Sequence, residues 1–453
     1  MARRFRKLSF PCALAAGVAF AALGSGCAWA DDAPDYSANM FGDLGGLREA
    51  FAKIGGTLQA TETSEAFANP FGGLKPGADY DGLTTLTVQV DTKAALHWDG
   101  GLFNVSLLNL HGDNYTPSYI GALQTISGVQ GDRATRLWEI WYDQKFGDQF
   151  DLRIGQQSLD VEFATSPSGA YLVNSLFGWP TLHALDMPGG GPAFPLASLG
   201  ARGRWQSGPW TALAGVFSGD PAPQTNPDPQ HANPYGLSFP LNGALAIAEA
   251  QYAVGQGEGE YAGVYKLGAW YDSLSFADLR YNIVGEPLAD PAADPTPRSH
   301  RGDFGVYALG DQTVWRGAEK ERTLNLFLRP TFAPQGDRNL VSFGVNGGLA
   351  LHDPLPGRKN DTLALGFGYV RLSNSAIGFS TDSALYNPTV FTPVRSYEAV
   401  FEATYQVQLT PYAQLQPDLQ YVSNPGGGVV DPLHPDRKVR DALIGGLRVN
   451  LTF

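Results

Sequence analysis

Charged and polar residues that could bind a polar solute recur at every second position of several short segments. In "LWEIWYDQKF", Glu139 and Asp143 alternate with apolar residues, and in "FDLRIGQQ" the same is true of Asp151, Arg153 and Gln157. Successive side chains of a strand point to opposite faces of a sheet, so each segment is expected to have one polar and one apolar face. Guanidinium groups donate hydrogen bonds and carboxylates accept them, so such a face can replace water around a polar solute.

Two further segments show the same pattern. "ARGRWQ" places Arg202 and Arg204 on the polar face, and "SYEAVFEATYQVQL" places Glu398 and Glu402 there. An Arg or Lys facing lipid near the bilayer midplane costs about 2–4 kcal/mol. The charged face is therefore expected to line the lumen of a transmembrane barrel, and the apolar face, which includes Trp138, is expected to contact lipid.

Aromatic rings near the ends of these segments are typical of the girdles that such barrels place at the membrane interfaces. We assign to the girdles Trp98, Trp141, Trp205, Tyr261 and Tyr405.

The residue types that other chemistries require are not arranged to support them. The seven His residues have no metal-ligand spacing, and the sequence has no H-E-x-x-H, P-loop or G-x-S-x-G pattern. We therefore expect no metal, no cofactor and no catalytic residue, and we interpret the chain as not an enzyme. A secreted carbohydrate-active enzyme with paired carboxylates stays open as an alternative, although no carboxylate pair is singled out. The formal net charge of −13 argues against a nucleic-acid partner.

The elements that would position these residues are strands. The predicted class is all-β, a transmembrane outer-membrane barrel of about sixteen antiparallel strands. The predicted strands span 53–61, 83–97, 102–111, 135–146, 149–157, 200–207, 210–218, 244–254, 260–272, 303–315, 322–333, 339–351, 361–373, 395–409, 412–423 and 440–453.

The connections between these strands alternate in length. Segments such as 62–82, 112–134 and 158–199 are long, whereas the intervening ones, such as "WDGG" and "SG", are tight. Outer-membrane barrels have short periplasmic turns and long extracellular loops. The alternation therefore favours an outer-membrane barrel over a soluble sandwich or propeller.

The N-terminal region resembles a secretory signal. Four basic residues precede the apolar run "ALAAGVAFAALG", and "AWA" before Asp31 is a small-residue cleavage site. We expect a signal peptide at 1–30, a periplasmic segment with a short helix at 31–52, and the porin barrel at 53–453. Loss of the four basic residues would take the formal net charge from −13 to −17.

One connection, residues 158–199, is unusually long. It contains several aromatic residues, among them Trp179, and has little net charge. Long loops in compact structures are usually functional or disordered, and this composition does not indicate disorder. It follows the fifth predicted strand, the position from which porins fold a loop inward, so we expect it to narrow the lumen.

Four segments carry a resemblance to a known family. "GGLKPGADYDGLTTLTVQVDTKAALHW", "GGLFNVSLLNLHGDN", "LWEIWYDQKFGDQFDLRIGQQSLDVEF" and "YLVNSLFG" resemble the first strands and third loop of the carbohydrate-selective porins of the OprB type. The resemblance implies passive diffusion of mono- and small oligosaccharides across the outer membrane of a Gram-negative cell. A general or cation-preferring porin is the alternative.

The resemblance also implies a constriction of charged and polar side chains. Sugar hydroxyls both donate and accept hydrogen bonds, so facing Arg and carboxylate groups suit them, while binding must stay weak enough for exit. The candidate constriction residues are Glu139, Arg153, Gln157, Asp160, Glu162, Trp179, Arg202 and Arg204.

The expected partners are sugars, outer-membrane lipid and the barrel-assembly machinery, and a homo-oligomer is left open. The last segment, "RVNLTF", alternates to its final residue, Phe453. We expect this strand to close the barrel against the first strand, because an unpaired edge is costly in lipid. A terminal aromatic residue also resembles the signal by which such barrels are recognised for insertion.

Overall fold

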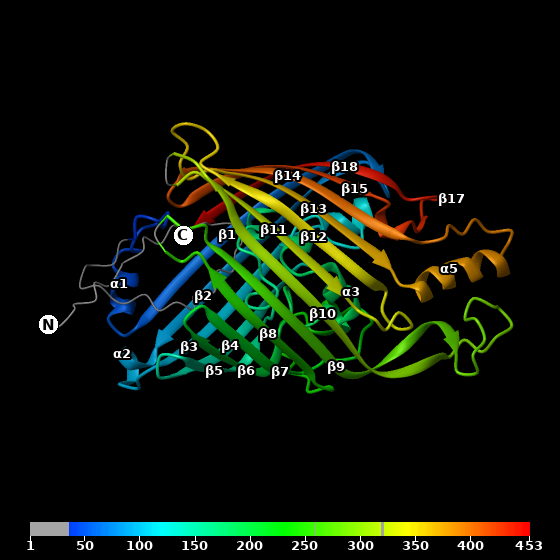
Figure 1. Ribbon diagram of the computed structural model, residues 1–453, viewed down its shortest axis with the longest axis horizontal. Coiled ribbons are helices and arrows are strands. Elements are labelled where there is room, and N and C mark those ends of the chain that lie inside the picture. The colour runs from blue at the N-terminus through cyan, green and yellow to red at the C-terminus, as the bar shows by residue number, and fades with distance from the viewer. Residues whose placement is uncertain (1–35, 258, 319–320) are drawn as a thin grey trace.

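The computed structural model describes residues 36–257, 259–318 and 321–453, which form a closed antiparallel β-barrel (Figure 1). Each strand pairs with its neighbours in sequence, and β18 closes the ring by pairing with both β15 and β1. The barrel strands are β1 Gly56–Gly73, β2 Gly77–Asp91, β3 Gly101–Gly112, β4 Ala134–Phe146, β5 Phe150–Gln157, β6 Ser198–Ser207, β7 Trp210–Phe217, β8 Leu245–Val254, β9 Gly263–Asn282, β10 Pro297–Arg316, β11 Thr323–Phe332, β12 Val341–His352, β13 Thr362–Leu372, β14 Tyr397–Thr410, β15 Ala413–Ser423 and β18 Arg440–Thr452. The prediction of sixteen antiparallel strands is confirmed, and each predicted segment overlaps one of them.

The remaining elements are short and lie in the connections. β16 Val430–Asp431 and β17 His434–Lys438 form a separate two-stranded sheet. The helices are α1 Leu47–Ala52, α2 Thr92–Leu96, α3 Thr181–Asp186, α4 Pro229–Ala232 and α5 Asn374–Tyr386, with single turns η1 Thr116–Ile120, η2 Gly169–Tyr171, η3 Ser175–Phe177, η4 Pro188–Gly190 and η5 Pro425–Gly427. Within the described ranges, none of the helices is both long enough and apolar enough to cross a membrane.

Long connections gather at one end of the barrel. In Figure 1, α5 and β17 lie at the right-hand end, whereas α1, α2 and the C-terminus lie at the left-hand end. Short turns such as 147–149 and 208–209 also belong to the left-hand end, because they join strands that run back from it. The predicted alternation of connection lengths therefore corresponds to two different ends of the molecule.

One predicted long connection is wrong. Residues 62–82 are not a loop, because β1 continues to Gly73 and β2 begins at Gly77. The outward residues of this part of β1 include Ala66 and Ala68, and the inward ones include Glu65. Such a strand has no strong apolar face, so hydrophobic periodicity does not detect it.

The end of the second predicted strand is also wrong. Residues 92–96 form helix α2, which starts where the carboxylate of Asp91 accepts hydrogen bonds from the backbone N–H groups of Lys93 and Ala94, at 2.7 and 3.2 Å. Aspartate at this position is a strong helix N-cap. The strand therefore ends at Asp91, six residues earlier than predicted.

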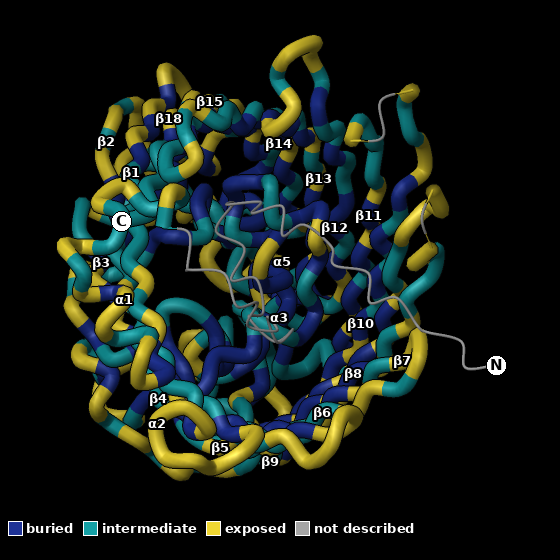
Figure 2. Tube along the Cα trace, turned by 90° about the vertical axis from the view of Figure 1, so that its left-hand side faces the viewer, coloured by how far each residue is buried: buried dark blue, intermediate teal, exposed yellow. Residues whose placement is uncertain are grey.

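The interior of the barrel is filled by two connections that fold inward. Figure 2, which looks in from the end carrying the termini, shows buried chain inside the ring of strands. We call residues 158–197 the inward loop and residues 113–133 the second inward loop. Buried side chains of the inward loop pack on the strands, for example Leu182 in a cluster with Leu245 and Phe177 in a cluster with Phe327. The prediction that this connection folds into the barrel is confirmed by these contacts.

The seam between β1 and β18 is held at the end that carries the termini. The strands pair from Thr61 opposite Thr452 to Gly73 opposite Arg440, which confirms that the last strand closes the barrel against the first. Beyond the ladder, the Phe453 N–H donates to the carbonyl of Ala60 at 2.9 Å.

Candidate constriction site

Three neighbouring strands bring the predicted charged residues into rows across the lumen face. In the register, Asp143 of β4 lies opposite Arg153 of β5, which lies opposite Arg202 of β6. Asp151 of β5 lies opposite Arg204 of β6 in the next inward row. The alternation that the sequence shows in each strand thus becomes a two-dimensional array of opposite charges.

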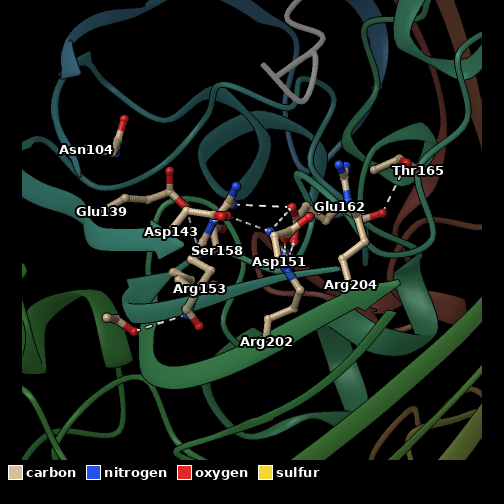
Figure 3. A network of polar contacts seen from close by, with 12 residues as sticks. Asn104, Glu139, Asp143, Asp151, Arg153, Ser158, Glu162, Thr165, Arg202 and Arg204 are labelled. Atoms are coloured by element: carbon tan, nitrogen blue, oxygen red, sulfur yellow. Dashed lines mark hydrogen bonds and ion pairs between the residues drawn. The ribbon is translucent and has the colours of Figure 1, made fainter. Parts of the chain in front are cut away.

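Arg202 is the centre of this array (Figure 3). Its side chain is 1% exposed and contacts three carboxylates, from β4, β5 and the inward loop. Nε lies 2.7 Å from Glu162, Nη2 lies 3.2 Å from Asp143, and Nη1 pairs with Asp151. One guanidinium group therefore ties the inward loop to two neighbouring strands.

Arg153 and Arg204 extend the array on either side. Arg153 lies 3.0 Å from Asp143 and 3.3 Å from Glu162, and its guanidinium stacks 3.9 Å from the ring centre of Trp141. Arg204 lies 2.8 Å from Asp151, and its side chain is 24% exposed. We call the six charged residues the charge network: Asp143, Asp151, Arg153, Glu162, Arg202 and Arg204.

The charge network is balanced, with three guanidinium groups and three carboxylates. Buried ion pairs are maintained only when their geometry and hydrogen bonding compensate for lost hydration. Each of the three carboxylates here contacts two arginines. The arrangement presents both donors and acceptors without a large net charge.

The other predicted residues position the inward loop. Glu139 of β4 accepts a hydrogen bond from the Ser158 N–H at 2.9 Å, at the start of the loop. Asp160 accepts from the Ser158 hydroxyl at 2.5 Å and from the Phe194 N–H at 3.1 Å, so it joins the two ends of the loop. Burial raises the pKa of Asp160, although these hydrogen bonds oppose the rise. Gln157 donates to the carbonyl of Gly200 at 3.1 Å.

Trp179 lies away from the charge network. Its indole is 7% exposed, donates to the carbonyl of Gly190 at 3.0 Å, and packs edge-on against His183 at 4.9 Å. The ring belongs to the packing of the inward loop. Burial lowers the pKa of His183 to about 3, so this neighbour is neutral.

Two tryptophan predictions are wrong, and both concern β4. Trp138 was expected to face lipid, but a β-bulge opposite Ser106 and Leu107 shifts the alternation, and the side chain is buried at 1% exposure against Phe194. Trp141 was assigned to a girdle, but it is 6% exposed and lies under Arg153 on the lumen side. A bulge adds one residue and so exchanges the two faces of a strand, which explains Trp138. Trp141 shares the face of Glu139 and Asp143, so its girdle assignment by residue type was the error.

Sequence reasoning missed the charged residues that hold the inward loop from the opposite part of the barrel. Asp311 of β10 accepts from the Ser168 N–H at 2.8 Å, and Glu402 of β14 accepts from the N–H groups of Val173 and Asn174 at 2.5 and 2.9 Å. Glu402 was expected to face the lumen, and it does so at 4% exposure. The alternation of apolar and polar residues in β14 predicts this orientation. The sequence contains no signal for the backbone groups that Glu402 binds.

Arg329 of β11 is the basic counterpart of these anchors. It is 0% exposed and donates to the carbonyls of Leu176, Phe177 and Gly178 at 2.7 to 3.0 Å, and also to the carbonyl of Ala164. These are all backbone acceptors of the inward loop. Charged side chains of the barrel therefore hold the backbone of the loop, in addition to the contacts that its own side chains make.

A group of residues outside the charge network has the composition of a metal site. The ligand atoms of Asp132, Asp228 and His231 lie within 4.8 Å of one another. They already pair with one another, since His231 lies 3.1 Å from Asp228 and 3.7 Å from Asp132. The buried Arg136 lies close enough for the charges of Asp132 and Asp228 to act on it, so it also supplies positive charge to the group. The arrangement is accounted for without an ion.

The comparisons with known proteins agree with the fold. Residues 75–453 match the family described as "Carbohydrate-selective porin, OprB family". The chain belongs to the OprB family. It is therefore an outer-membrane porin, as the sequence predicted.

Relatives and solved structures extend this likeness over the whole chain. Porin B of Pseudomonas aeruginosa is 25% identical over 478 aligned positions, which cover 99% of each chain. The putative porin QuiX of Acinetobacter baylyi is 23% identical and covers 91% of this chain and 93% of its own. The high-pH structure of Pseudomonas putida OprB has a TM-score of 0.80 at 22% identity and covers 93% of this chain and 100% of its own. The OprB fold is thus present from the first strand to the last.

Proposed function

We propose that the charge network is the sugar-selective constriction of this OprB-family porin. The observation that carries the proposal is the row of Asp143, Arg153 and Arg202 across three strands, faced by Glu162 from the inward loop. A sugar that slides along this row meets donors and acceptors in turn, so its hydroxyls exchange water for protein groups one at a time. Weak, repeated contacts of this kind allow entry and exit.

Trp141 orients one arginine of the charge network, and the two arginines that are partly exposed are the ones that a sugar can contact. The indole of Trp141 stacks with Arg153, so it fixes the guanidinium plane next to the passage. Side-chain exposure of 11% for Arg153 and 24% for Arg204 makes these two the arginines that a permeating sugar would touch. Arg202, at 1% exposure, holds the network together instead.

The test is the block of ion current by glucose or maltose in planar bilayers. A hydrogen bond to a charged group contributes about 1.5–3 kcal/mol, so Arg153→Ala is expected to weaken sugar block about ten-fold. Arg133→Ala is the matched control, because Arg133 is 67% exposed and pairs with Asp113 outside the network. Equal sugar block in wild type and Arg153→Ala would remove Arg153 from the constriction.

A general or cation-preferring porin is the alternative within the same class. The balance of three arginines against three carboxylates supports weak charge selectivity at this position. The reversal potential in a salt gradient separates the two functions. A strong preference for cations that sugars do not alter would favour the alternative.

An outer-membrane porin has to be exported and then assembled in the membrane. We infer that residues 1–30, which lie outside the described residues, are a cleaved signal peptide, and that the protein acts as a channel and not as an enzyme. We also infer that Phe453 takes part in recognition by the barrel-assembly machinery before the seam closes. Deleting Phe453 is expected to lower the yield of heat-resistant barrel more than the conductance of each folded channel, as measured by gel mobility and by single-channel recording.

A further inference from the structure

The segment that precedes β1 exposes an unusual number of large apolar side chains. Their exposed fractions range from 37% for Leu44 to 58% for Phe41, and the set consists of Met40, Phe41, Leu44, Leu47 and Ile54. Exposed apolar side chains that are grouped in this way mark a contact with another molecule or with a membrane. We call residues 40–54 the rim segment.

Helix α1 of the rim segment packs on the outward side of the barrel. The ring of Phe51 occupies the position that a Cβ atom on Gly56 would take. Gly56 and Leu58 share one face of β1, whereas Glu65, an odd number of residues away, points into the lumen. Phe51 therefore covers the end of the face that β1 turns toward lipid.

The two flanks of α1 differ in polarity. Arg48 is directed at the end of the seam, where its guanidinium group bonds backbone carbonyls. Each residue of an α-helix is turned by about 100° from the one before it, so Leu47 and Phe51 lie on one flank of Arg48. Glu49 and Lys53 lie on the other flank, where their charges pair at 3.1 Å. The apolar flank is thus the one on the outward side.

The rim segment is continuous with the lipid-facing surface of the last strand. Phe453 belongs to the same outward row as Leu447, which is 44% exposed. Phe41 stacks on the ring of Phe453, and the Met40 N–H donates to the carbonyl of Thr452 at 2.8 Å. In Figure 2, α1 and the C-terminus lie on the same side of the ring of strands. The apolar surface of the rim segment therefore begins where that of β18 ends.

The neighbouring turn places an aromatic ring at the same end of the barrel. The Asp91 N–H donates to the carbonyl of Gly55 at 2.8 Å, so the turn that follows β2 adjoins the rim segment. In this turn Trp98 is exposed, and its indole donates to the side chain of Gln144 at 2.7 Å. Gln144 alternates with the lumen-facing Asp143 and so lies on the outward face of β4. Tryptophan is enriched where a membrane meets water.

We propose that the rim segment is an interfacial anchor whose apolar flank lies among the headgroups of the periplasmic phospholipid leaflet. Short helices with one apolar and one charged flank lie in the plane of such an interface. The end of an outer-membrane barrel that carries the short turns faces the periplasm. Phospholipid is the occupant that the continuity with the lipid-facing surface favours. The anchor requires only that the chain is an outer-membrane barrel, so it does not depend on the role of the charge network.

Fluorescence quenching in vesicles tests this proposal. Both cysteines, Cys12 and Cys27, precede the described residues and lie in the inferred signal peptide, so a single introduced cysteine can be labelled in the exported protein. Leu47→Cys is labelled with bimane, and Glu49→Cys on the charged flank is the matched control. The vesicles contain phosphatidylethanolamine, phosphatidylglycerol and a lipid with a spin label near its headgroup.

We expect the spin-labelled lipid to quench the label at Leu47→Cys about two-fold more than the label at Glu49→Cys, because an interfacial helix buries its apolar flank about 5–10 Å deep. Iodide in the water should quench the two labels in the opposite order. Equal quenching by lipid, or stronger quenching by iodide at Leu47→Cys, would overturn the proposal. The vesicles contain no other protein, so a flank reserved for a protein partner would give that second result.

A second pair of variants guards against an effect of the label on folding. Ile54→Cys and Lys53→Cys repeat the comparison, because Ile54 is exposed and apolar and Lys53 belongs to the charged flank. Heat-dependent mobility on gels checks that each labelled barrel is folded. Lipid quenching that does not differ within this pair would also count against the anchor.

Discussion

Arg202 and Arg204 lie two residues apart on the same face of β6, but they differ in burial and in the number of carboxylates that they contact. Arg202 is 1% exposed and contacts Asp143, Asp151 and Glu162, whereas Arg204 is 24% exposed and contacts Asp151. Removing one partner of a buried ion pair leaves the other charge without compensation. A substitution of Arg202 is therefore expected to affect mainly stability, and a substitution of Arg204 is expected to affect mainly permeation.

Arg202→Met is expected to lower the free energy of unfolding by about 3–5 kcal/mol, because three carboxylates lose their shared partner. Arg204→Met, the control, should cost much less, since solvent reaches its guanidinium group. Guanidinium chloride unfolding in detergent micelles, followed by tryptophan fluorescence, measures both. Equal unfolding midpoints for the two variants would show that the burial of Arg202 does not matter.

At the scale of single residues, the sequence predicts orientation better than contact. The alternation places Arg153, Arg202 and Glu402 in the lumen correctly, because period 2 is a property of every regular strand. It misplaces Trp138, because one bulge changes the period locally. It also assigns Trp141 to a girdle by residue type, although the ring shares the lumen face of Glu139 and Asp143, where it stacks with Arg153.

The inward loop is positioned as an element by contacts to its backbone. Asp311 and Glu402 accept its N–H groups, and Arg329 donates to its carbonyls. Buried polar networks of this type hold a single arrangement when every member is satisfied. The width of the passage therefore depends on residues that lie on the far strands.

Arg329→Met removes a donor from four carbonyls of the inward loop, and among these the carbonyl of Leu176 keeps the side-chain amide of Asn346. We expect larger and less uniform single-channel conductance and weaker sugar block, from barrels that still show heat-dependent mobility on gels. Arg371→Met is the control, because Arg371 is exposed and bonds Asn374 at the other face of the barrel. Unchanged conductance in Arg329→Met would mean that apolar packing alone fixes the loop.

At the scale of elements, strands are predictable and the path of the loop is not. Each strand leaves its own periodic signal, except where the outward residues are as small as Ala66 and Ala68 in β1. The anchors of the inward loop join residues far apart in sequence, such as Ser168 and Asp311, and a single sequence contains no signal for such pairs.

For the whole molecule, a segment outside the barrel adds contacts to the seam at which the barrel closes. Arg48 of α1 is 4% exposed and donates to the carbonyls of Gly42, Leu58 and Phe453. Phe41 stacks on the ring of Phe453 with centroids 5.5 Å apart. The segment before β1 thus covers the end of β18 and ties both sides of the seam together.

Arg48→Ala is expected to lower the temperature at which the folded barrel loses its compact mobility on gels, because hydrogen bonds from a charged group contribute about 1.5–3 kcal/mol. Insertion into the membrane should stay near wild-type yield, since the strands still pair. Lys53→Ala is the control, as Lys53 is 71% exposed and pairs with Glu49. A normal unfolding temperature in Arg48→Ala would show that the ladder alone secures the seam.

The anchoring of the inward loop through its backbone has one more consequence. Loop side chains that are neither buried nor bonded to the barrel can be exchanged while Arg329, Asp311 and Glu402 keep the main chain on its course. Part of the architecture of the loop is therefore encoded in barrel residues that lie outside the charge network. This arrangement makes those positions of the loop replaceable, and it gives both natural variation and laboratory redesign a way to alter the permeant while every lipid-facing position stays the same.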